Sequence, residues 1–321
     1  MDLNAQDIHF SQIESSPLNY NPAKAGDFNG TYRFVMNHKR QWNSFTNAYR
    51  TFSGSFDSKY AVPHQPMNIG GGLLVNSDIA GDGNMGLVSF QIPISVHYEI
   101  EHLSTKLSFG LMAGYNQYKV DVNKLSFGSD YDGSIYNPGI NGGESIGGNQ
   151  LSFMDFSTGM NLLYGDPYQT SVQLGVAYYH LNEPDVSFSG DYFNALPGKT
   201  IVYADFSWPL SRGSYLLPQI FYFSQGPYSE ILVGAFYRLH PDNMYFHTLK
   251  TGFFYRGNDA VIFKLAFDYL DYQVGLSYDF NISNLNTVSK GYGGFEFSFI
   301  YIVPTKHEPL PFDKSYCPSF L

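Results

Sequence analysis

The chain has 321 residues, of which 43% are hydrophobic, 18% aromatic and only 14% charged, and its formal net charge is -10. A soluble domain carries about a quarter charged residues, whereas here 27 Tyr and 28 Phe stand in their place, as suits rings at the two water–lipid boundaries. No basic run offers the surface that nucleic acid needs, and no run of about 18 apolar residues could form a membrane-spanning helix.

The first 30 residues show little alternation and contain Pro17 and Pro22, so we expect them to lie outside any sheet. Phe10 and Leu18 make the segment too apolar for a solvated tail, and we expect it to pack in the periplasm or in a lumen. The stretch 3–5, Leu-Asn-Ala, resembles the small-residue end of a secretory cleavage site. We therefore expect a signal peptide upstream in the native reading frame, removed from this chain.

Residues 31–303 repeat an alternation of apolar and polar residues, as in Val88 to Ile100 and again in Tyr272 to Asn281. Successive side chains of a strand point to opposite faces, so the pattern predicts a sheet with one dry and one wet face. Repeated around a closed wall, it predicts an all-β fold, a transmembrane antiparallel up-and-down β-barrel of about 14 strands. The predicted strands are Tyr32–Trp42, Thr51–Tyr60, Asn68–Asp78, Leu87–Ile100, Lys106–Val120, Leu151–Tyr164, Thr170–Asn182, Lys199–Leu210, Tyr215–Gly226, Glu230–Leu239, Phe246–Gly257, Ala260–Tyr269, Tyr272–Ile282 and Phe295–Val303.

The connections differ in length according to the parity of the strand before them. Those after odd-numbered strands include 121–150, 183–198 and 283–294, all long, whereas nearly all those after even-numbered strands are short. Outer-membrane barrels have short periplasmic turns and longer outer loops. We therefore expect a bacterial outer-membrane protein with long outer loops, short periplasmic turns and both termini in the periplasm.

Residues 304–321 form a proline-rich C-terminal tail, which we expect in the periplasm because proline cannot donate to a sheet. The tail holds Cys317, the only cysteine, which cannot form an internal disulfide. Two roles are therefore possible for Cys317: an inert thiol, or a covalent link to a partner or a lipid.

The chain carries no recognisable catalytic or metal motif. Its nine histidines lack His-Glu-x-x-His spacing, and no Gly-x-Ser-x-Gly elbow occurs. Asp78, Asp82 and Asn84 form an incomplete calcium loop that turn chemistry explains, and the run Gly70 to Gly72 predicts a bend in a strand. We expect no catalytic residue, no metal, no cofactor and no small-molecule substrate, and hence not an enzyme.

Several short motifs occur in a fixed order along nearly the whole chain. They are Gln6 to Gln12, Pro17 to Gly26, Arg40-Gln41-Trp42, His180 to Pro184, Leu196-Pro197, Tyr278-Asp279-Phe280, Gly293 to Glu296 and Cys317-Pro318. Together they resemble the PorP/SprF family, outer-membrane proteins of the type IX secretion system of Bacteroidota. The lone cysteine belongs to that pattern, whereas Ser319 stands where the family pattern has a basic residue.

The resemblance implies a barrel accessory in protein export and, in some species, in gliding motility. Besides membrane lipid, the implied partners are other type IX secretion proteins: a secreted adhesin through its C-terminal domain, or periplasmic ring and motor lipoproteins. The family offers no catalytic residues to transfer. A diffusion channel for small solutes is the alternative function, because a barrel of this size permits a lumen.

Partner contacts are expected from aromatic loop residues and from the terminal motifs, since interfaces favour Tyr and Phe over Lys and Glu. Each candidate also has a competing structural role: the loop aromatics could stiffen their loops, Trp42 could lie at the membrane interface, and Pro22 could break the entry segment. The candidates are Pro22, Trp42, Tyr131, Tyr136, Phe188, Tyr192, Phe193 and Cys317.

Overall fold

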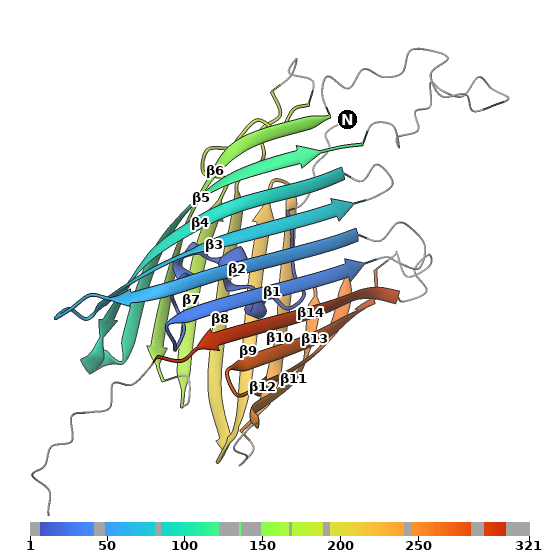
Figure 1. Ribbon diagram of the computed structural model, residues 1–321. Helices are drawn as coiled ribbons and strands as arrows, with labels where there is room; N and C mark the ends of the chain where they lie inside the picture. Colours follow the sequence, from blue (N-terminus) through green and yellow to red (C-terminus); the bar gives the residue numbers. More distant parts are fainter. Residues whose placement is uncertain are drawn as a thin grey trace, which may run out of the picture.

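The computed structural model describes residues 7–41, 49–80, 85–121, 135, 149–166, 169–188, 193–240, 246–283 and 292–305. Fourteen antiparallel strands close into one up-and-down barrel, in which β14 pairs with β1 (Figure 1). The strands are β1 (Tyr32–Gln41), β2 (Tyr49–Ala61), β3 (Met67–Ala80), β4 (Met85–Ile100), β5 (Thr105–Lys119), β6 (Gln150–Gly165), β7 (Ser171–Tyr179), β8 (Lys199–Ser211), β9 (Ser214–Gln225), β10 (Tyr228–Leu239), β11 (Phe246–Arg256), β12 (Ala260–Tyr269), β13 (Tyr272–Asn281) and β14 (Tyr292–Val303). This confirms the predicted fold. No described helix is both long and apolar enough to span a membrane.

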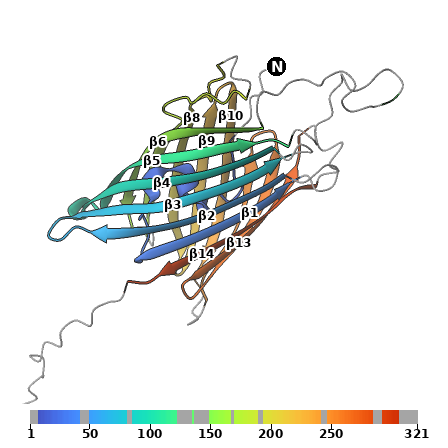
Figure 2. The ribbon, with the colours of Figure 1, turned by 45° about the horizontal axis from the view of Figure 1, so that its top comes forward.

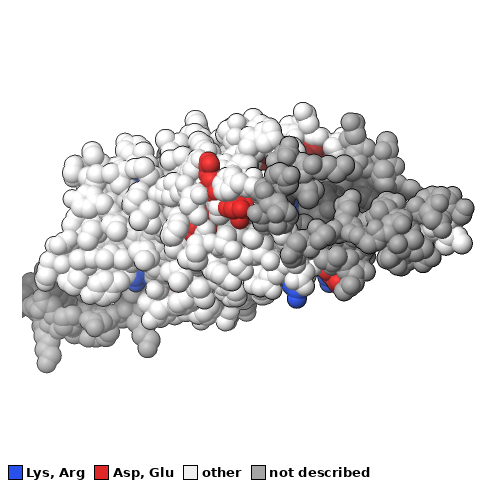
Figure 3. All heavy atoms as spheres, turned by 90° about the horizontal axis from the view of Figure 1, so that it is seen from above, with Lys and Arg blue, Asp and Glu red and all other residues white. Residues whose placement is uncertain are grey.

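The alternation in the sequence is the alternation between the outside and the inside of the wall. In β4, Ile92 and Ile94 are more than half exposed on the outside, whereas Ser95 and His97 are buried on the luminal side. The outward side chains are mostly apolar, and Figure 3 shows one face of the molecule with few charged atoms. An apolar exterior around a polar interior is the arrangement that lipid requires of a barrel.

The observed strands begin and end within three residues of the predicted ones. The largest differences are at β14, which begins at Tyr292, and at β7, which ends at Tyr179 rather than Asn182. His180 has a φ of 59°, a left-handed backbone conformation that cannot continue a strand. The sequence pattern alone does not reveal this break, because residues 180–182 still alternate.

The two ends of the barrel differ in their connections. We call the end that holds the connections after odd-numbered strands the loop end, and the opposite one the turn end. Connections 120–149, 180–198 and 282–291 lie at the loop end, whereas connections such as 212–213 and 270–271 at the turn end are very short. The strands that flank the three long connections therefore meet at one end, as the parity argument predicts, although connections 226–227 and 257–259 at that end are short too.

Residues 7–30, which we call the plug, run through the lumen (Figures 1 and 2). Asp7 contacts His180 at the loop end, whereas just beyond the plug the N–H of Thr31 donates to the C=O of Val303 at the turn end. The first described residues thus lie at the loop end, and the plug crosses the lumen before β1 begins at the turn end. Strand parity fixes only where β1 starts, and the segment before it is long enough to run back through the barrel.

Three short helical segments shape the plug: η1 (Ile13–Ser15), α1 (Pro17–Tyr20) and η2 (Pro22–Lys24). A fourth one, η3 (Glu101–Leu103), forms the turn between β4 and β5. The apolar core lies inside the lumen, where Tyr20 meets Tyr203 edge to face with ring centroids 5.0 Å apart. Its further members include Ile13, Leu18, Ile201, Phe221, Leu232, Phe236, Phe254 and Ile262.

Candidate functional site

The contact surface between plug and wall holds many of the buried polar and charged side chains of the described chain. Seven charged side chains of the described strands point into the lumen and are almost fully buried: Lys39, Asp57, Asp155, Arg256, Lys264, Asp279 and Glu296. Buried charges are stable only when paired or hydrogen-bonded. The plug supplies partners to most of them.

The half of the plug nearer the loop end is held by carboxylates of β13 and β14. The N–H of Ser11 donates to Glu296 Oε2 at 2.7 Å, and the N–H of Gln12 donates to Glu296 Oε1 at 3.0 Å. The Ser11 hydroxyl donates to Asp279 Oδ2 at 2.7 Å, and Arg256 bonds both Asp279 and the Ser11 oxygen, at 2.9 and 2.7 Å. One serine therefore joins two acidic residues and one basic residue of the wall.

The start of the plug is held by an ionic cluster around His180. Its Nε2 lies 2.7 Å from Asp7 Oδ2 and its Nδ1 lies 3.0 Å from Asp155 Oδ1, while Lys199 Nζ lies 3.5 Å from the same Asp7 oxygen. Burial alone would lower the pKa of His180, but Asp7 and Asp155 outweigh it and raise that pKa to about 9. Burial would likewise raise the pKa of Asp7, but Lys199 and His180 hold it well below its usual value. The cluster is therefore ionic at neutral pH.

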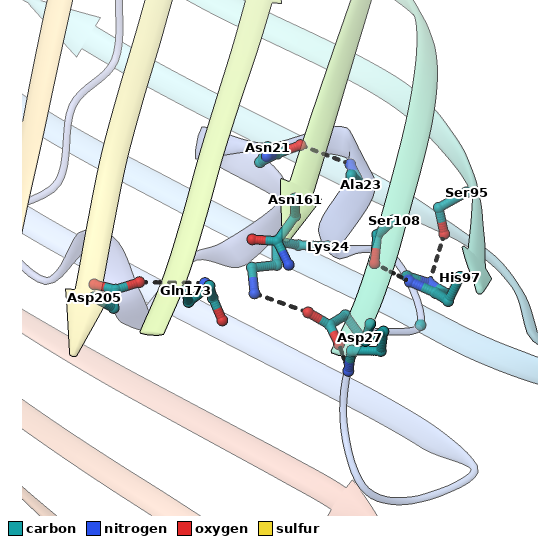
Figure 4. A network of polar contacts seen from close by, with 12 residues as sticks. Asn21, Ala23, Lys24, Asp27, Ser95, His97, Ser108, Asn161, Gln173 and Asp205 are labelled. Carbon is teal, nitrogen blue, oxygen red and sulfur yellow. Dashed lines mark hydrogen bonds and ion pairs between the residues drawn. The ribbon is translucent and has the colours of Figure 1, made fainter. Parts of the chain in front are cut away.

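Asn21 anchors the middle of the plug, between α1 and η2 (Figure 4). Its Oδ1 accepts from the N–H of Ala23 at 2.8 Å, which caps η2. Its Nδ2 donates to the C=O of Met160 at 2.9 Å and to the Tyr203 hydroxyl at 3.1 Å, and Tyr203 donates in turn to Asn161 Oδ1. The side chain therefore links the plug to β6 and β8 at once.

Near the turn end, the backbone of the plug bonds to luminal side chains of β2 and β4. The C=O of Ala25 accepts from Ser95 Oγ at 2.6 Å and from His97 Nε2 at 2.7 Å. The N–H of Gly26 donates to Asp57 at 2.7 Å, and Arg33 forks onto both oxygens of that carboxylate. A bidentate charged pair is among the stronger buried interactions.

Asp27 closes the plug at its turn end. It pairs with Lys24 at 2.8 Å and with Lys106 of β5. Burial would raise the pKa of Asp27, but the two lysines outweigh it and hold that pKa far below the usual range. The plug is thus tied to the wall by charges at both of its ends.

Close approach of the plug backbone requires wall residues without side chains. A Cβ on Gly70 would lie 2.1 Å from the Ala25 oxygen, and one on Gly159 would lie 2.0 Å from Asn21 Oδ1. Gly70 is therefore a docking position for the plug inside β3, whereas Gly72 of the same run lies close to Phe56 of β2.

In the part of the chain that the structure describes, cavities remain beside the plug. One of about 300 Å³ lies toward the turn end, between Tyr20 and Lys24 of the plug and polar wall residues such as Gln173 and Asp205. Another of about 50 Å³ lies at the loop end beside Asp7. Among the described residues, no cluster of three or more His, Cys, Asp or Glu side chains could hold a metal ion.

The structure separates the predicted contact residues. Pro22 is buried inside the lumen, where a partner outside the barrel does not reach it, whereas Phe188 is half-buried and Phe193 is 75% exposed in the connection between β7 and β8. The remaining candidates lie outside the described residues: Trp42, Tyr131, Tyr136, Tyr192 and Cys317. Sequence reasoning missed the plug–wall contacts, although charged residues at luminal positions of membrane strands are a signal for them.

Comparison with known proteins now bears on this geometry. The family described as "Type IX secretion system membrane protein PorP/SprF" matches residues 2–301. The chain belongs to the PorP/SprF family. Membership associates the barrel with type IX secretion, and together with the fold it indicates the outer membrane. No curated protein matches the sequence significantly.

Three solved structures are similar to this PorP/SprF barrel in fold. The Pseudomonas putida toluene transporter TodX is 11% identical with a TM-score of 0.55, covering 94% of this chain and 95% of that one. The monoaromatic hydrocarbon channel CymD is 11% identical with a TM-score of 0.54, covering 91% and 94%. The Ralstonia pickettii toluene transporter TbuX is 10% identical with a TM-score of 0.52, covering 94% and 96%. At such low identity the likeness concerns the fold alone.

The family motifs have a structural meaning in this barrel, because the structure brings several of them together. The Ser11-Gln12 motif meets the motifs at Asp279 and Glu296, and Asp7 meets His180. Motifs that stand up to 285 residues apart are therefore two sides of one plug–wall contact.

Proposed function

We propose that the barrel is an accessory of the type IX secretion system that binds and anchors other secretion proteins, and that it makes or breaks no bonds. The observation that supports this proposal is the plug. It occupies the lumen and is tied to the wall by buried pairs such as Arg256–Asp279, to which Ser11 bonds, and Arg33–Asp57, to which Gly26 bonds. A barrel closed in this way offers its two ends, rather than its bore, for function.

The proposal includes two kinds of partner. A secreted surface adhesin would meet the loop end, and ring or motor lipoproteins of the periplasm would meet the turn end. This orientation follows from the rule that outer-membrane barrels keep their short turns in the periplasm. A role in gliding motility would follow where the bound adhesin serves movement. Phe193 is the exposed aromatic candidate at the loop end.

The test is gentle extraction from secretion-active cells followed by pull-down of the native barrel. We expect another type IX secretion component to co-purify in stoichiometric amount. A barrel of another family from the same membrane serves as the control bait. Recovery of this barrel alone would contradict an anchoring function.

A small-solute channel is the second candidate, favoured by the cavity of about 300 Å³ beside the plug. It also fits the roles of the two similar folds TodX, a toluene transporter, and CymD, a monoaromatic hydrocarbon channel. Conductance in a planar bilayer separates the two functions. Steady openings of the wild-type barrel would favour the channel, and silence would favour the plugged accessory.

A further inference from the structure

Strand β6 extends well beyond its neighbour β7 at the loop end. The β6–β7 ladder runs only from the Thr158–Tyr178 pair to the Gly165–Ser171 pair. Residues 150–157 of β6 pair fully with β5 on their other side, without a register shift. In the part of the chain that the structure describes, this is the longest stretch of wall with a strand on one side only.

The direction of each backbone group in this stretch follows from its neighbours. The N–H of Val120 donates to the C=O of Asn149, so the odd-numbered residues of this stretch face β5. Even-numbered residues face the β7 side, where the Phe156 N–H and C=O are taken by Asn182 and Leu181. Alternation along a strand therefore directs the backbone groups of Gln150, Ser152 and Met154 to the same side.

We call these three residues, Gln150, Ser152 and Met154, the β6 edge. The C=O of Met154 accepts from Asn182 Nδ2 at 2.8 Å. Among the described residues, the other backbone donors and acceptors of the β6 edge have no partner. Exposed edges of this kind are templates for another strand, and natural proteins usually guard them with lysine, proline or a bulge. The β6 edge has none of these.

The described continuation of β7 does not fill the β6 edge. His180 and Glu183 have φ values of 59° and 40°, which turn the chain away from the strand direction. The chain then pairs with itself through the Asp185–Ala195 bridge and through a bond from the N–H of Leu196 to Pro184.

The surroundings indicate what kind of chain would fit. The outward side chains of Gln150 and Ser152 are polar and exposed, which places this part of the edge above the apolar band, whereas the outward Met154 is apolar and lies at its border. On the luminal side, Leu151 and Phe153 are half-buried and offer apolar contacts. Two acidic residues, Glu183 and Asp185, are exposed just after Asn182, which bonds Met154 and Phe156.

We propose that the β6 edge receives an extended strand of a partner protein by β-augmentation. The incoming strand would alternate apolar and polar residues and carry a basic residue toward Glu183 and Asp185. Main-chain hydrogen bonds supply affinity in this mode, and alternate side chains supply specificity. The inference depends on the proposed function, because the partner is the protein that the barrel anchors.

Hydrogen exchange tests the contact directly, because strand addition protects particular amides. We compare the purified barrel in detergent with the complex extracted from secretion-active cells. The amides of Ser152 and Met154 should exchange fast in the barrel alone and at least about tenfold more slowly in the complex. The amides of Leu151 and Phe153, which face β5, serve as internal controls and should be slow in both.

The outcomes of this experiment are distinct. A complex that leaves the Ser152 and Met154 amides unprotected overturns the β6-edge contact and leaves the anchoring function standing. Protection in the isolated barrel means that the chain covers its own edge, and protection that grows with barrel concentration means a second copy. Either outcome overturns the proposal. Absence of any partner overturns the anchoring function and this contact together.

Substitution of one edge residue adds a second test. Ser152→Pro removes an N–H that bonds nothing in the described barrel and blocks an incoming strand. Partner recovery should fall about tenfold or more, while the barrel keeps its heat-modifiable mobility on gels. Ser152→Ala is the matched control and should recover the partner normally. Met154→Pro repeats the test should Ser152→Pro fail to fold. Undiminished recovery with either folded proline variant overturns the proposal.

Discussion

Ser11 joins two buried carboxylates by itself, since its N–H donates to Glu296 and its hydroxyl to Asp279. Arg256 completes the group by bonding Asp279 and the Ser11 oxygen. A buried hydrogen bond to a charged group contributes about 1.5–3 kcal/mol. Individual plug residues are therefore fixed as firmly as the core residues of a soluble domain.

Removal of one charge from this group should destabilise the barrel strongly. Arg256→Met leaves Asp279 buried without its cation, which we expect to cost about 3–5 kcal/mol. The paired change Arg256→Met with Asp279→Asn should recover much of that loss, since Asp279 is the most buried acidic partner of Arg256, whereas Glu230 and Asp259 are more exposed. Thermal unfolding in detergent measures both. Equal loss in the single and double variants would contradict the role of the charge pair.

The His180 cluster gives the plug a defined pH dependence. The pKa of His180 is raised from 6.5 to about 9, so its stabilising contribution is complete below pH 6.5 and is lost as the pH rises through 9. The pKa of Asp7 is lowered instead, so its contribution is present above pH 3.8 and fades in stronger acid. Hydrogen exchange of the backbone at Ile8 and His9 should therefore be slowest between about pH 4 and 6.5 after correction for intrinsic rates.

The control for this pH prediction is His180→Gln, which keeps a donor but cannot carry the charge. Its corrected exchange at Ile8 and His9 should be faster at pH 6 and should no longer change between pH 6.5 and 9. An unchanged profile in the variant would assign the pH dependence to another group.

At the scale of elements, the plug fits because two strands of the wall, β3 and β6, leave space for it. Gly159 of β6 accepts Asn21 and Gly70 of β3 accepts Ala25, at separations that a methyl group would not allow. Short helical segments with proline at their starts, at Pro17 and Pro22, let the plug turn sharply between these contacts. The plug and the wall are therefore complementary in shape as well as in charge.

Gly159→Val should displace the plug without breaking the wall. Its Cβ would lie within 2.0 Å of Asn21 Oδ1, and valine is otherwise suited to a strand. We expect the amides of Ala23 to Ala25 to exchange at least about tenfold faster than in the wild type. Gly54→Val is the matched control, since a Cβ there meets only ordinary contacts. Equal exchange in both variants would show that the close approach is unimportant.

The wall was predictable from the sequence, whereas the plug contacts were not. Alternation reveals strands because successive side chains face lipid and lumen in turn, and lipid requires apolar residues where the lumen accepts polar ones. Strands β4 and β13 follow that rule closely. The plug follows no period, and its partners lie up to 286 residues away in sequence. Lys39 and Lys264 at luminal positions indicate that something must neutralise or hydrogen-bond them, but not which segment does so.

At the scale of the whole molecule, the plug determines whether the barrel can act as a channel or only as an anchoring protein. Wild-type barrel in a planar bilayer should show no steady conductance, because the plug is tied at both ends of the lumen. Gly159→Val should raise the frequency of openings, and Gly54→Val should not. Steady wild-type openings would contradict an occluded barrel and favour the channel.

The plug also has a consequence for biogenesis. It precedes the first strand, yet its Ser11 bonds Glu296 of the last one, and Lys39 of β1 donates to its His9 carbonyl. The plug is synthesised before β1, yet it contacts both β1 and β14, the strands whose pairing closes the barrel. It therefore cannot dock fully until translation and insertion are nearly complete. Docking of the plug would then report that the barrel has closed. In a chain truncated before β14, the half of the plug nearer the loop end should be sensitive to protease.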